Sequence, residues 1–372
     1  MREIKIVVGA NYGDEGKGLC TDALVRKAVS EKKTVLNVLF NGGPQRAHTV
    51  EYPGLSRHVF HHFGAGTIAG ADTYFDPGFM MNPMVFTKER NALLPFLFRQ
   101  RNLRKVYVHK NCRVITPFDM MANQIIELGR SEKHGTCGHG IWETVVRQRD
   151  PEYAFLWKDA KKNDCELRQT LKNIRNYYTE KRGLVIPGEY EIPWNSENLI
   201  THFIGDIRQM LGNTIIVSDM PQSYDTVVFE AGQGLAIDFD ADPIFATPSR
   251  TGSRDLIPML SSTDDIEVIY VTRTYFTRHG AGPFPTEVSR IVLNDKTNIT
   301  NGWQGELRYG KFSADEMLAR IEKDAVPGIK KSLLITHTNE EEIPAAEMSS
   351  LSGYFDSIYT SGDPHTVNFS QI

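Results

Sequence analysis

The chain has few cysteines and lacks long apolar stretches. Its four cysteines stand alone, with no C-x-x-C pair, which suits a reducing compartment and argues against a structural zinc site or a disulfide framework. No uninterrupted apolar run approaches the length of a membrane span. The N-terminus leads straight into a predicted strand, without a signal peptide. We therefore expect a cytoplasmic protein, in the host cytoplasm if it is viral, with no membrane partner.

The chain also lacks a strong excess of charge of either sign. Its formal net charge is −4, with 42 lysines and arginines against 46 aspartates and glutamates. The chain therefore has no excess of positive charge that would attract duplex nucleic acid, and we expect no nucleic-acid partner. A hydrophobic fraction of 40% and a charged fraction of 24% are ordinary for a globular protein. There is no internal repeat and no low-complexity linker, and we expect residues 1–372 to form one domain.

Strand-like and helix-like segments alternate along most of the chain. The short apolar runs that read as buried strands are 4–8, 34–40, 106–108, 214–217, 226–229, 266–272 and 332–336. Helical patterns lie between several of them, at 19–29, 119–128, 166–180 and 313–324. This alternation predicts an α/β fold with a mostly parallel central sheet flanked by helices, in which ligands bind on loops at the strand ends. Residues 145–200 are more polar and read as a helical excursion on the same domain.

The most informative segment is a glycine-rich loop, Gly9 to Gly18, between the first predicted strand and the first predicted helix. A strand, a glycine turn and a helix start together build a phosphate cradle, because backbone N–H groups converge there and the helix dipole favours an anion. Lys17 adds a charge for a nucleotide phosphate. The loop is not a standard P-loop, since Asn11 and Gly18 stand where a glycine and a Mg²⁺-binding Ser or Thr belong. An ordinary glycine-rich turn is the alternative.

Three further loops carry groups suited to chemistry at the ends of predicted strands. The segment 41–49 holds a glycine pair and His48, which can act as a general acid or stabilise an oxyanion. Gln233 lies between two glycines in the segment 229–234, where it can both donate and accept hydrogen bonds. The segment 277–287 contains a Gly-x-Gly-Pro-x-Pro run, which is typical of a shaped loop. Taken singly, each has a purely structural alternative.

Together these segments resemble the adenylosuccinate synthetase family. The first loop resembles the family's G-D-E-G-K-G signature, and the second resembles its G-G-x-x-x-x-H-T pattern, at 42–49. E-x-x-Q-G stands at 230–234 and G-A-G-P-F-P-T-E at 280–287, in the family's order and at compatible distances. Partial motif matches at 135–140 and 360–364 extend the resemblance over nearly the whole chain. Four motifs in order are far more specific than any one of them.

The resemblance implies a nucleoside-triphosphate-dependent ligase that joins aspartate to C6 of a 6-oxopurine nucleotide through a 6-phosphoryl intermediate. Asp14 matches the base that takes the proton from N1, His48 the acid that contacts O6 and the transferring phosphoryl group, and Lys17 a phosphate ligand. Mg²⁺ is implied as well, with the Asp14 carboxylate and the backbone carbonyl of Ala47 as its protein ligands. The further positions that match nucleotide or phosphate contacts are Gly13, Glu15, Gly16, Gly18, Gln45, Thr49, Thr136, Gln233, Thr247, Asn339 and Gly362.

The resemblance also implies a homodimer, in which an arginine of one subunit reaches the nucleotide phosphate bound by the other. Arg147 is the nearest match, and Arg149 competes with it because the local alignment is loose. The other implied partners are small molecules, namely a purine nucleoside monophosphate, L-aspartate and a nucleoside triphosphate.

The chain departs from the family pattern where substrates are distinguished. In the second loop, Gln45 replaces the amide that meets the nucleotide, and Arg46 puts a charge where a small residue is usual. The arginine-rich aspartate loop is replaced by residues 300–310, in which Thr300 and Arg308 are the expected aspartate contacts. A guanidinium pairs with a carboxylate in a bidentate way, which favours Arg308. A surface arginine at the start of a helix is the alternative for Arg308.

The sequence leaves alternatives for both the phosphoryl donor and the purine substrate. Asn339 stands where the family carries the aspartate that reads the guanine of GTP, and an amide is no charged bidentate acceptor, so ATP becomes a candidate beside GTP. Retention of Asp14 slightly favours IMP as the substrate, which would give adenylosuccinate. Short members with weakened donor motifs resemble a phage branch that acts on dGMP and makes the 2-amino analogue for diaminopurine synthesis, so dGMP or GMP is the alternative. A non-catalytic nucleotide-binding regulator and a ligase for another amino acid are further alternatives.

Overall fold

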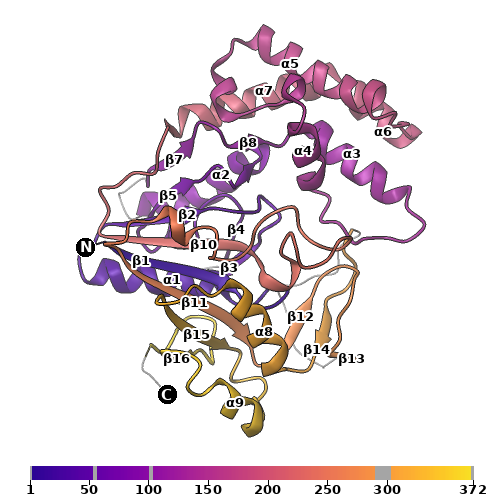
Figure 1. The fold of residues 1–372 in the computed structure, drawn as a ribbon. Coiled ribbons are helices and arrows are strands. Elements are labelled where there is room, and N and C mark those ends of the chain that lie inside the picture. The colour runs from indigo at the N-terminus through magenta and orange to yellow at the C-terminus, as the bar shows by residue number, and fades with distance from the viewer. Residues whose placement is uncertain (1, 53–56, 100–103, 290–302, 370–372) are drawn as a thin grey trace.

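A nine-stranded sheet forms the centre of the computed structural model, which describes residues 2–52, 57–99, 104–289 and 303–369 (Figure 1). The strand order is β16-β15-β11-β1-β10-β2-β5-β7-β9, and every neighbouring pair is parallel. Its strands are β1 (Glu3–Gly9), β2 (Val35–Leu39), β5 (Asp72–Phe75), β7 (Val106–His109), β9 (Ile215–Val217), β10 (Thr226–Gly234), β11 (Asp265–Arg273), β15 (Lys330–Thr336) and β16 (Ser357–Thr360). The predicted α/β fold with a mostly parallel sheet is confirmed.

Short strands and the helices surround the central sheet. The short strands form three small sheets: β3 (His48–Val50) with β4 (His58–Phe60), β6 (Met80–Met81) with β8 (Arg113–Val114), and β14 (Arg308–Gly310) between β12 (Phe276–Arg278) and β13 (Glu287–Val288). The helices are α1 (Lys17–Ser30), α2 (Pro83–Arg99), α3 (Pro117–Leu128), α4 (Ile141–Gln148), α5 (Asp164–Asn176), α6 (Gly188–Asn195), α7 (Glu197–Gly212), α8 (Ala314–Asp324) and α9 (Ala345–Leu351). Among the described residues, no helix is long and apolar enough to cross a membrane.

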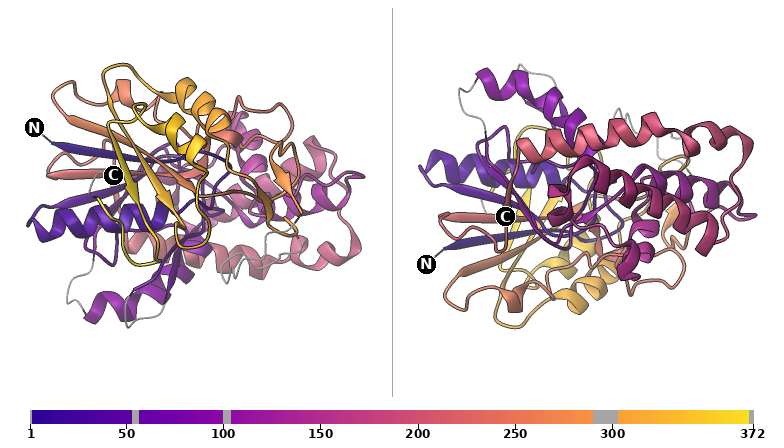
Figure 2. Two further views of the ribbon diagram at one scale, coloured as in Figure 1. Left: turned by 90° about the horizontal axis from the view of Figure 1, so that it is seen from below. Right: turned by 90° about the horizontal axis from the view of Figure 1, so that it is seen from above.

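Helices cover both faces of the sheet, which explains the continuous apolar character of its strands. Side chains alternate across a strand, so Ile4 and Ile6 of β1 pack toward α8 and α9, while Val7 packs toward α1. The two further views show the helices on either side of the sheet (Figure 2). A parallel strand that is buried on both faces can carry apolar residues at every position.

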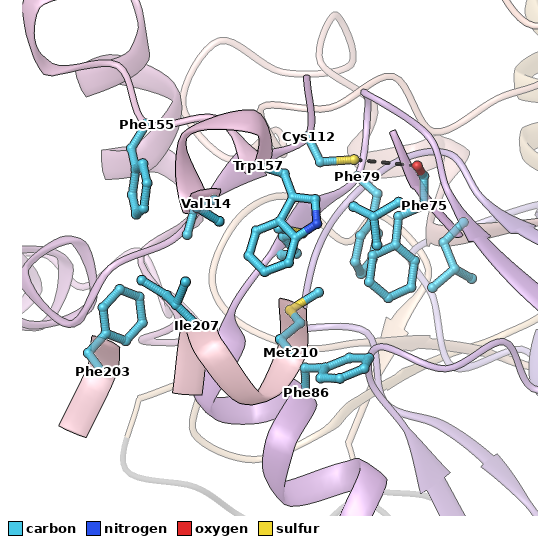
Figure 3. Close-up of a cluster of buried hydrophobic side chains, with 14 of the residues drawn as sticks. Phe75, Phe79, Phe86, Cys112, Val114, Phe155, Trp157, Phe203, Ile207 and Met210 are labelled. Atoms are coloured by element: carbon cyan, nitrogen blue, oxygen red, sulfur yellow. Dashed lines mark hydrogen bonds between the residues drawn. The ribbon is translucent and has the colours of Figure 1, made fainter. Parts of the chain in front are cut away.

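The helices α4 to α7 form a layer at one end of the sheet, where a third apolar core lies (Figure 1). Trp157 is fully buried in this core. Its ring lies among Phe75, Phe79 and Met210, as Figure 3 shows. The core thus joins the helical layer, which contributes Met210 of α7, to strand β5, which contributes Phe75.

The structure extends the strand that was predicted at 226–229. Pairing with β1 and β2 continues to Glu230 and, with an irregularity in register, to Gly234, so the E-x-x-Q-G motif lies inside β10 and not in a loop after it. The glycines and the glutamine hide this strand end from sequence patterns, because none of them is a typical strand residue. Helix α2 was not predicted either, whereas α6 and parts of α4 and α7 lie in the range 145–200, which was expected to be helical.

A substitution test compares two tryptophans of the helical layer. Trp157 is fully buried, whereas Trp142 on α4 is 43% exposed. We expect Trp157→Ala to lower the free energy of unfolding by about 3–5 kcal/mol, because it leaves a cavity in the core. Trp142→Ala, as the control, is expected to cost a small fraction of that amount. Urea denaturation of both variants measures the difference, and equal losses would contradict the described packing.

Candidate active site

Six neighbouring strands, β16 to β2, end at one edge of the sheet, and the loops that follow all six line a single cleft of about 750 Å³. The cleft lies where the carboxyl ends of parallel strands bind ligands in such folds. Each contributing loop is represented by at least one polar side chain. In strand order, these residues are Asp363 after β16, His337 after β15, His279 after β11 and β12, Asp14 after β1, Gln233 at the end of β10, and His48 in the segment after β2.

The glycine loop after β1 is held in place through its carbonyl oxygens. Three consecutive carbonyls each accept a hydrogen bond from a side chain of a neighbouring strand. The pairs are Gly13 O with Thr277 Oγ1 at 3.3 Å, Asp14 O with Arg273 Nε at 2.5 Å, and Glu15 O with Thr336 Oγ1 at 2.9 Å. The first helical hydrogen bond of α1 joins Cys20 N to Gly16 O. The amides of Lys17, Gly18 and Leu19 therefore have no partner within the helix, and they form an anion site at its N-terminus.

Two glycines allow this loop to lie so close to its neighbours. A Cβ on Gly9 would lie 2.1 Å from Glu15 Oε2, so no other residue fits beneath the loop. A Cβ on Gly18 would lie 3.0 Å from the Cβ of His48. Because Gly18 has no side chain, the first turn of α1 lies directly against the start of β3, and the anion site adjoins His48.

Glu15 shapes the loop from inside. Its carboxylate accepts a hydrogen bond from the amide of Asn11 at 2.6 Å and lies 3.4 Å from the Lys17 ammonium. Both side chains are almost completely buried. Burial raises the pKa of Glu15, although the charge of Lys17 opposes it. The amide of Asn11 and the ammonium of Lys17 thus hold the Glu15 carboxylate inside the loop.

Asp14 presents a partly exposed carboxylate to the cleft. Its carboxylate is 30% exposed, and its Oδ2 lies 2.9 Å from Nε2 of His279. Burial acts to raise the pKa of Asp14, but the hydrogen bond and charge of His279, together with Arg273 and Lys17, hold it well below its usual value. Asp14 is thus ionised throughout the neutral range.

His48 lies across from the glycine loop and is held by a buried ion pair. Its Nδ1 lies 2.6 Å from Glu230 Oε1, which also accepts a 2.6 Å hydrogen bond from Arg46. The other oxygen of Glu230 accepts from Asn37 and from the amide of Ala65. Burial acts to raise the pKa of Glu230, yet Arg46 and His48 lower it to about 2. An ionised Glu230 fixes a proton on Nδ1 of His48 and leaves Nε2 as the ring nitrogen that can serve the cleft.

A family model described as adenylosuccinate synthetase matches residues 6–307. The chain belongs to the adenylosuccinate synthetase family. It is therefore an enzyme of that type, a ligase that forms a carbon–nitrogen bond and uses a nucleoside triphosphate, and the resemblance drawn from its motifs is confirmed. Family membership implies small-molecule substrates and typically Mg²⁺.

Individual members of the family are distant relatives. The adenylosuccinate synthetase of Psychrobacter cryohalolentis is 28% identical over 348 residues, which cover 87% of this chain and 75% of that protein. The Nostoc adenylosuccinate synthetase is 29% identical over 297 residues, which cover 76% of this chain and 62% of that protein. Among solved structures, the fully ligated adenylosuccinate synthetase of Plasmodium falciparum matches with a TM-score of 0.67 and 17% identity, covering 91% of this chain and 77% of that one. Cyanophage S-2L succinoaminodeoxyadenylate synthetase, solved with dGMP and dATP, matches with a TM-score of 0.65 and 17% identity over 98% and 93% of the two chains.

Most residues expected from the resemblance to adenylosuccinate synthetases meet in the cleft. Those that line it are Gly13, Asp14, Glu15, Gly16, Lys17, Gly18, Gln45, Ala47, His48, Thr49, Gln233 and Asn339. Gly362 lies between two lining residues, Ser361 and Asp363. Thr136 and Thr247 are not among the lining residues; Thr136 donates to Asn123, and the amide of Thr247 donates to Ile237. Thr300 lies outside the described residues.

The expectation for Arg147 is wrong in this structure. Its side chain is fully buried within its own subunit, where it binds Asp119 through Nε at 2.7 Å and Nη2 at 2.9 Å. It also donates to the carbonyls of Val114 and Tyr153. A guanidinium with these partners cannot extend to a neighbouring subunit, because leaving them would strand the buried carboxylate of Asp119. Arg149, the other candidate, lies one residue past α4 and is exposed.

Arg308 lies beside the cleft and not in its lining. It lies on β14 and not at a helix start, and its guanidinium pairs with Glu287 at 2.5 Å and donates to the carbonyls of Gly280 and Gly282. In this conformation Arg308 braces the segment 280–287 and offers no direct contact to a ligand in the cleft. Gln304, from the segment that replaces the aspartate loop, does line the cleft.

Sequence reasoning assigned no role to several functional neighbours. Glu230 belongs to the E-x-x-Q-G motif, and its charge at the end of an apolar run was the signal that it needs a partner. Arg273 ends strand β11 and His279 follows β12, so their positions at strand ends were the available signal. Their contacts to Asp14 depend on packing between strands that are more than 250 residues apart from it in sequence.

The ion pair around His48 makes its titration a test of the site. Burial, and next the charge of Arg46, lower the pKa of His48 to about 4, while Glu230 opposes them. We therefore expect the imidazole of the ligand-free enzyme to be neutral above about pH 4, and an NMR titration of its ring to give a midpoint near that value. Arg46→Met is expected to raise the midpoint, because it removes a positive charge, whereas Arg168→Met, on α5 and outside the cleft, is the control. A wild-type midpoint near the free value of about 6.5 would contradict this geometry.

Proposed function

We propose that this enzyme joins L-aspartate to C6 of a 6-oxopurine nucleotide, with hydrolysis of a nucleoside triphosphate through a 6-phosphoryl intermediate. The observation that carries the proposal is the meeting of Asp14, His48 and the first-turn amides of α1 in one cleft. An anion site alone serves many nucleotide-binding proteins. The addition of an ionised carboxylate and an imidazole is what phosphorylation of a purine oxygen requires.

In the first step, the carboxylate of Asp14 takes the proton from N1 of the purine. The electron pair moves to O6, which attacks the γ-phosphorus of the triphosphate, so that the O6–P bond forms and the bond to the β-phosphate oxygen breaks. The first-turn amides and Lys17 bind phosphate oxygens and hold the reacting atoms in line. Because the pKa of Asp14 is lowered, its carboxylate is ionised at neutral pH and can accept this proton.

His48 serves the oxygen that is phosphorylated. The phosphoryl group brings negative charge beside the ring, and this favours the imidazolium form, which donates at Nε2. In the second step, the amine of aspartate attacks C6, the C6–O6 bond breaks, and inorganic phosphate leaves with the proton that the amine loses. A donor at Nε2 stabilises the leaving phosphate oxygen in that step.

The residues of the cleft fit the Mg²⁺ that the family implies. The Asp14 carboxylate is ionised and partly exposed, and Ala47 lines the same cleft, so its carbonyl and Asp14 would hold the ion. In the described ranges, no three His, Cys, Asp or Glu side chains are grouped as metal ligands. Such a sparse set suits Mg²⁺, which keeps several waters and binds largely through substrate phosphates. When bound, the ion would neutralise charge on the triphosphate.

The proposal also names the purine substrate and the phosphoryl donor. We favour IMP because Asp14 is retained, with dGMP or GMP as the alternative. The fold also matches a cyanophage enzyme that was solved with dGMP and dATP, and this supports keeping the alternative. Asn339 lines the cleft at the donor end, and ATP is therefore proposed beside GTP as the phosphoryl donor.

A product assay tests the proposal. Purified protein is incubated with Mg²⁺, aspartate, ATP or GTP, and each of IMP, dGMP and GMP, and the products are identified by mass. We expect an aspartyl adduct and released phosphate with at least one purine. Nucleotide binding without phosphate release or adduct would instead favour a regulator that kept the fold.

Substitutions assign the two central roles. We expect Asp14→Ala and His48→Ala each to lower kcat by about 10²–10⁴-fold, because general acid–base and charge-stabilising groups contribute about that much. Nucleotide binding, measured by calorimetry, is expected to survive. His202→Ala, on an exposed position of α7, is the control and should leave kcat unchanged. Wild-type turnover in either site variant would refute the role given to that residue.

We further propose a homodimer in which Arg149 of one subunit meets the nucleotide phosphate of the other. The variants Arg149→Ala and Asp14→Ala are then both impaired, because each lacks a different residue of the shared site. Co-expression of the two variants is expected to restore part of the activity, because a hybrid dimer contains one site with both residues intact. Activity of the mixture no higher than that of the separate variants would contradict a shared site.

A further inference from the structure

Asp14 has a backbone conformation that needs external support. Its φ is 56°, in the left-handed region, which a residue with a β-carbon rarely adopts. Such conformations persist where the surrounding structure holds them, and they concentrate at functional sites. The direction of the Asp14 carboxylate into the cleft depends on this backbone conformation.

Arg273 supplies that support through the Asp14 carbonyl. Its Nε donates to Asp14 O at 2.5 Å, and its residue is only 6% exposed. The neighbouring carbonyls of the loop are held differently, by the short side chains of Thr277 and Thr336 on rigid strands. An arginine side chain is long and has many rotamers, so its hold on Asp14 is only as firm as the groups that fix the guanidinium.

Tyr275 and Glu340 fix the guanidinium. Arg273 Nη1 donates to Tyr275 Oη at 2.9 Å, and Tyr275 Oη donates to Glu340 Oε2 at 2.5 Å. The Tyr275 residue is 2% exposed, and the centre of the guanidinium lies 5.5 Å from its ring centroid. Three consecutive hydrogen bonds thus run from Glu340 through Tyr275 and Arg273 to the backbone of Asp14.

The far end of this chain lies in the loop that follows β15. The amide of Glu340 donates to the carbonyl of His337, and that carbonyl also accepts from Thr274 Oγ1, beside Tyr275. His337, Asn339 and Glu340 line the cleft, at the end that receives the donor nucleotide in the proposed reaction. The hydrogen-bond chain therefore connects the loop at the donor end with the residue that faces the purine in the proposed reaction.

We propose that Arg273, Tyr275 and Glu340 form a positioning relay, which holds Asp14 in its left-handed conformation and makes its placement depend on the loop that receives the donor nucleotide. None of the three is proposed to touch the reacting atoms. The link to turnover rests on the proposed function, whereas the hold on the Asp14 backbone does not.

The test is Tyr275→Phe, which removes the hydroxyl at the centre of the relay and keeps the ring. The hydroxyl binds two charged groups, so we expect kcat to fall about tenfold or more while the KM for the purine changes little. The matched control is Tyr270→Phe. Tyr270 lies on β11 and donates to the buried Asp324 at 2.9 Å, away from the cleft, so its loss should lower the melting temperature but not kcat.

Substitutions at the outer end distinguish positioning from general structural damage. Glu340→Gln retains an acceptor for the tyrosine hydroxyl and is expected to keep kcat near the wild-type value, whereas Glu340→Ala should resemble Tyr275→Phe. If one relay is involved, the double variant Tyr275→Phe/Glu340→Ala loses no more than the worse single variant. Losses that multiply, or a kcat for Tyr275→Phe equal to that of Tyr270→Phe, would overturn the relay.

A measurement without turnover separates this inference from the proposed reaction. Amide hydrogen exchange of the peptide that covers residues 13–18 is expected to increase in Tyr275→Phe and to stay at the wild-type level in Tyr270→Phe. If the wild-type enzyme makes no adduct with any purine, the proposed reaction fails, yet the exchange result still decides the relay. If adduct forms and exchange in the loop is unchanged, only the relay fails.

Discussion

The parallel pairing of six neighbouring strands is the constraint on which the cleft depends. Because β16, β15, β11, β1, β10 and β2 all run in one direction, their carboxyl ends meet at one edge of the sheet. Groups from residues as far apart as Tyr12 and Pro364 thereby line one cleft. Backbone hydrogen bonds and a core on each face of the sheet fix this arrangement, so the loops can carry polar residues that contribute little to folding.

Charge in the cleft is organised in pairs that hold one another in place. Asp14 faces His279, and Glu15 lies under Lys17. Glu230 joins Arg46 to His48 in a buried cluster. A buried charge is tolerated only with a partner, so each of these pairs limits the conformations that its members can adopt. The result is a site in which the proposed base and the proposed acid are both oriented before a substrate binds, which is how enzymes reduce the reorganisation that accompanies reaction.

The glycine loop shows how a motif acquires its meaning from its surroundings. By pattern alone it is an incomplete P-loop, with Gly18 in the place of a metal-binding hydroxyl. In the structure, Gly18 lets α1 approach His48, and Asp14 takes over as the acidic group that faces the cleft. Carbonyl oxygens held by strands β11, β12 and β15 leave the amides of α1 to serve an anion. The departures from the P-loop are therefore part of how this site is built.

The sequence by itself determined the class of fold, the family and a group of residues, among them Asp14, Lys17 and His48, that line the cleft. Apolar runs, glycine turns and ordered motifs are local signals, which can be recognised in the sequence without knowledge of the fold. Only the tertiary structure decided that Arg147 is buried against Asp119, that Arg308 braces a loop, and that Glu230, Arg273 and His279 support His48 and Asp14. An arginine has the same appearance in a sequence whether it meets a substrate, a carboxylate of its own subunit or a backbone carbonyl. Its role is set by partners that lie tens to hundreds of residues away, and packing alone brings them within hydrogen-bond distance.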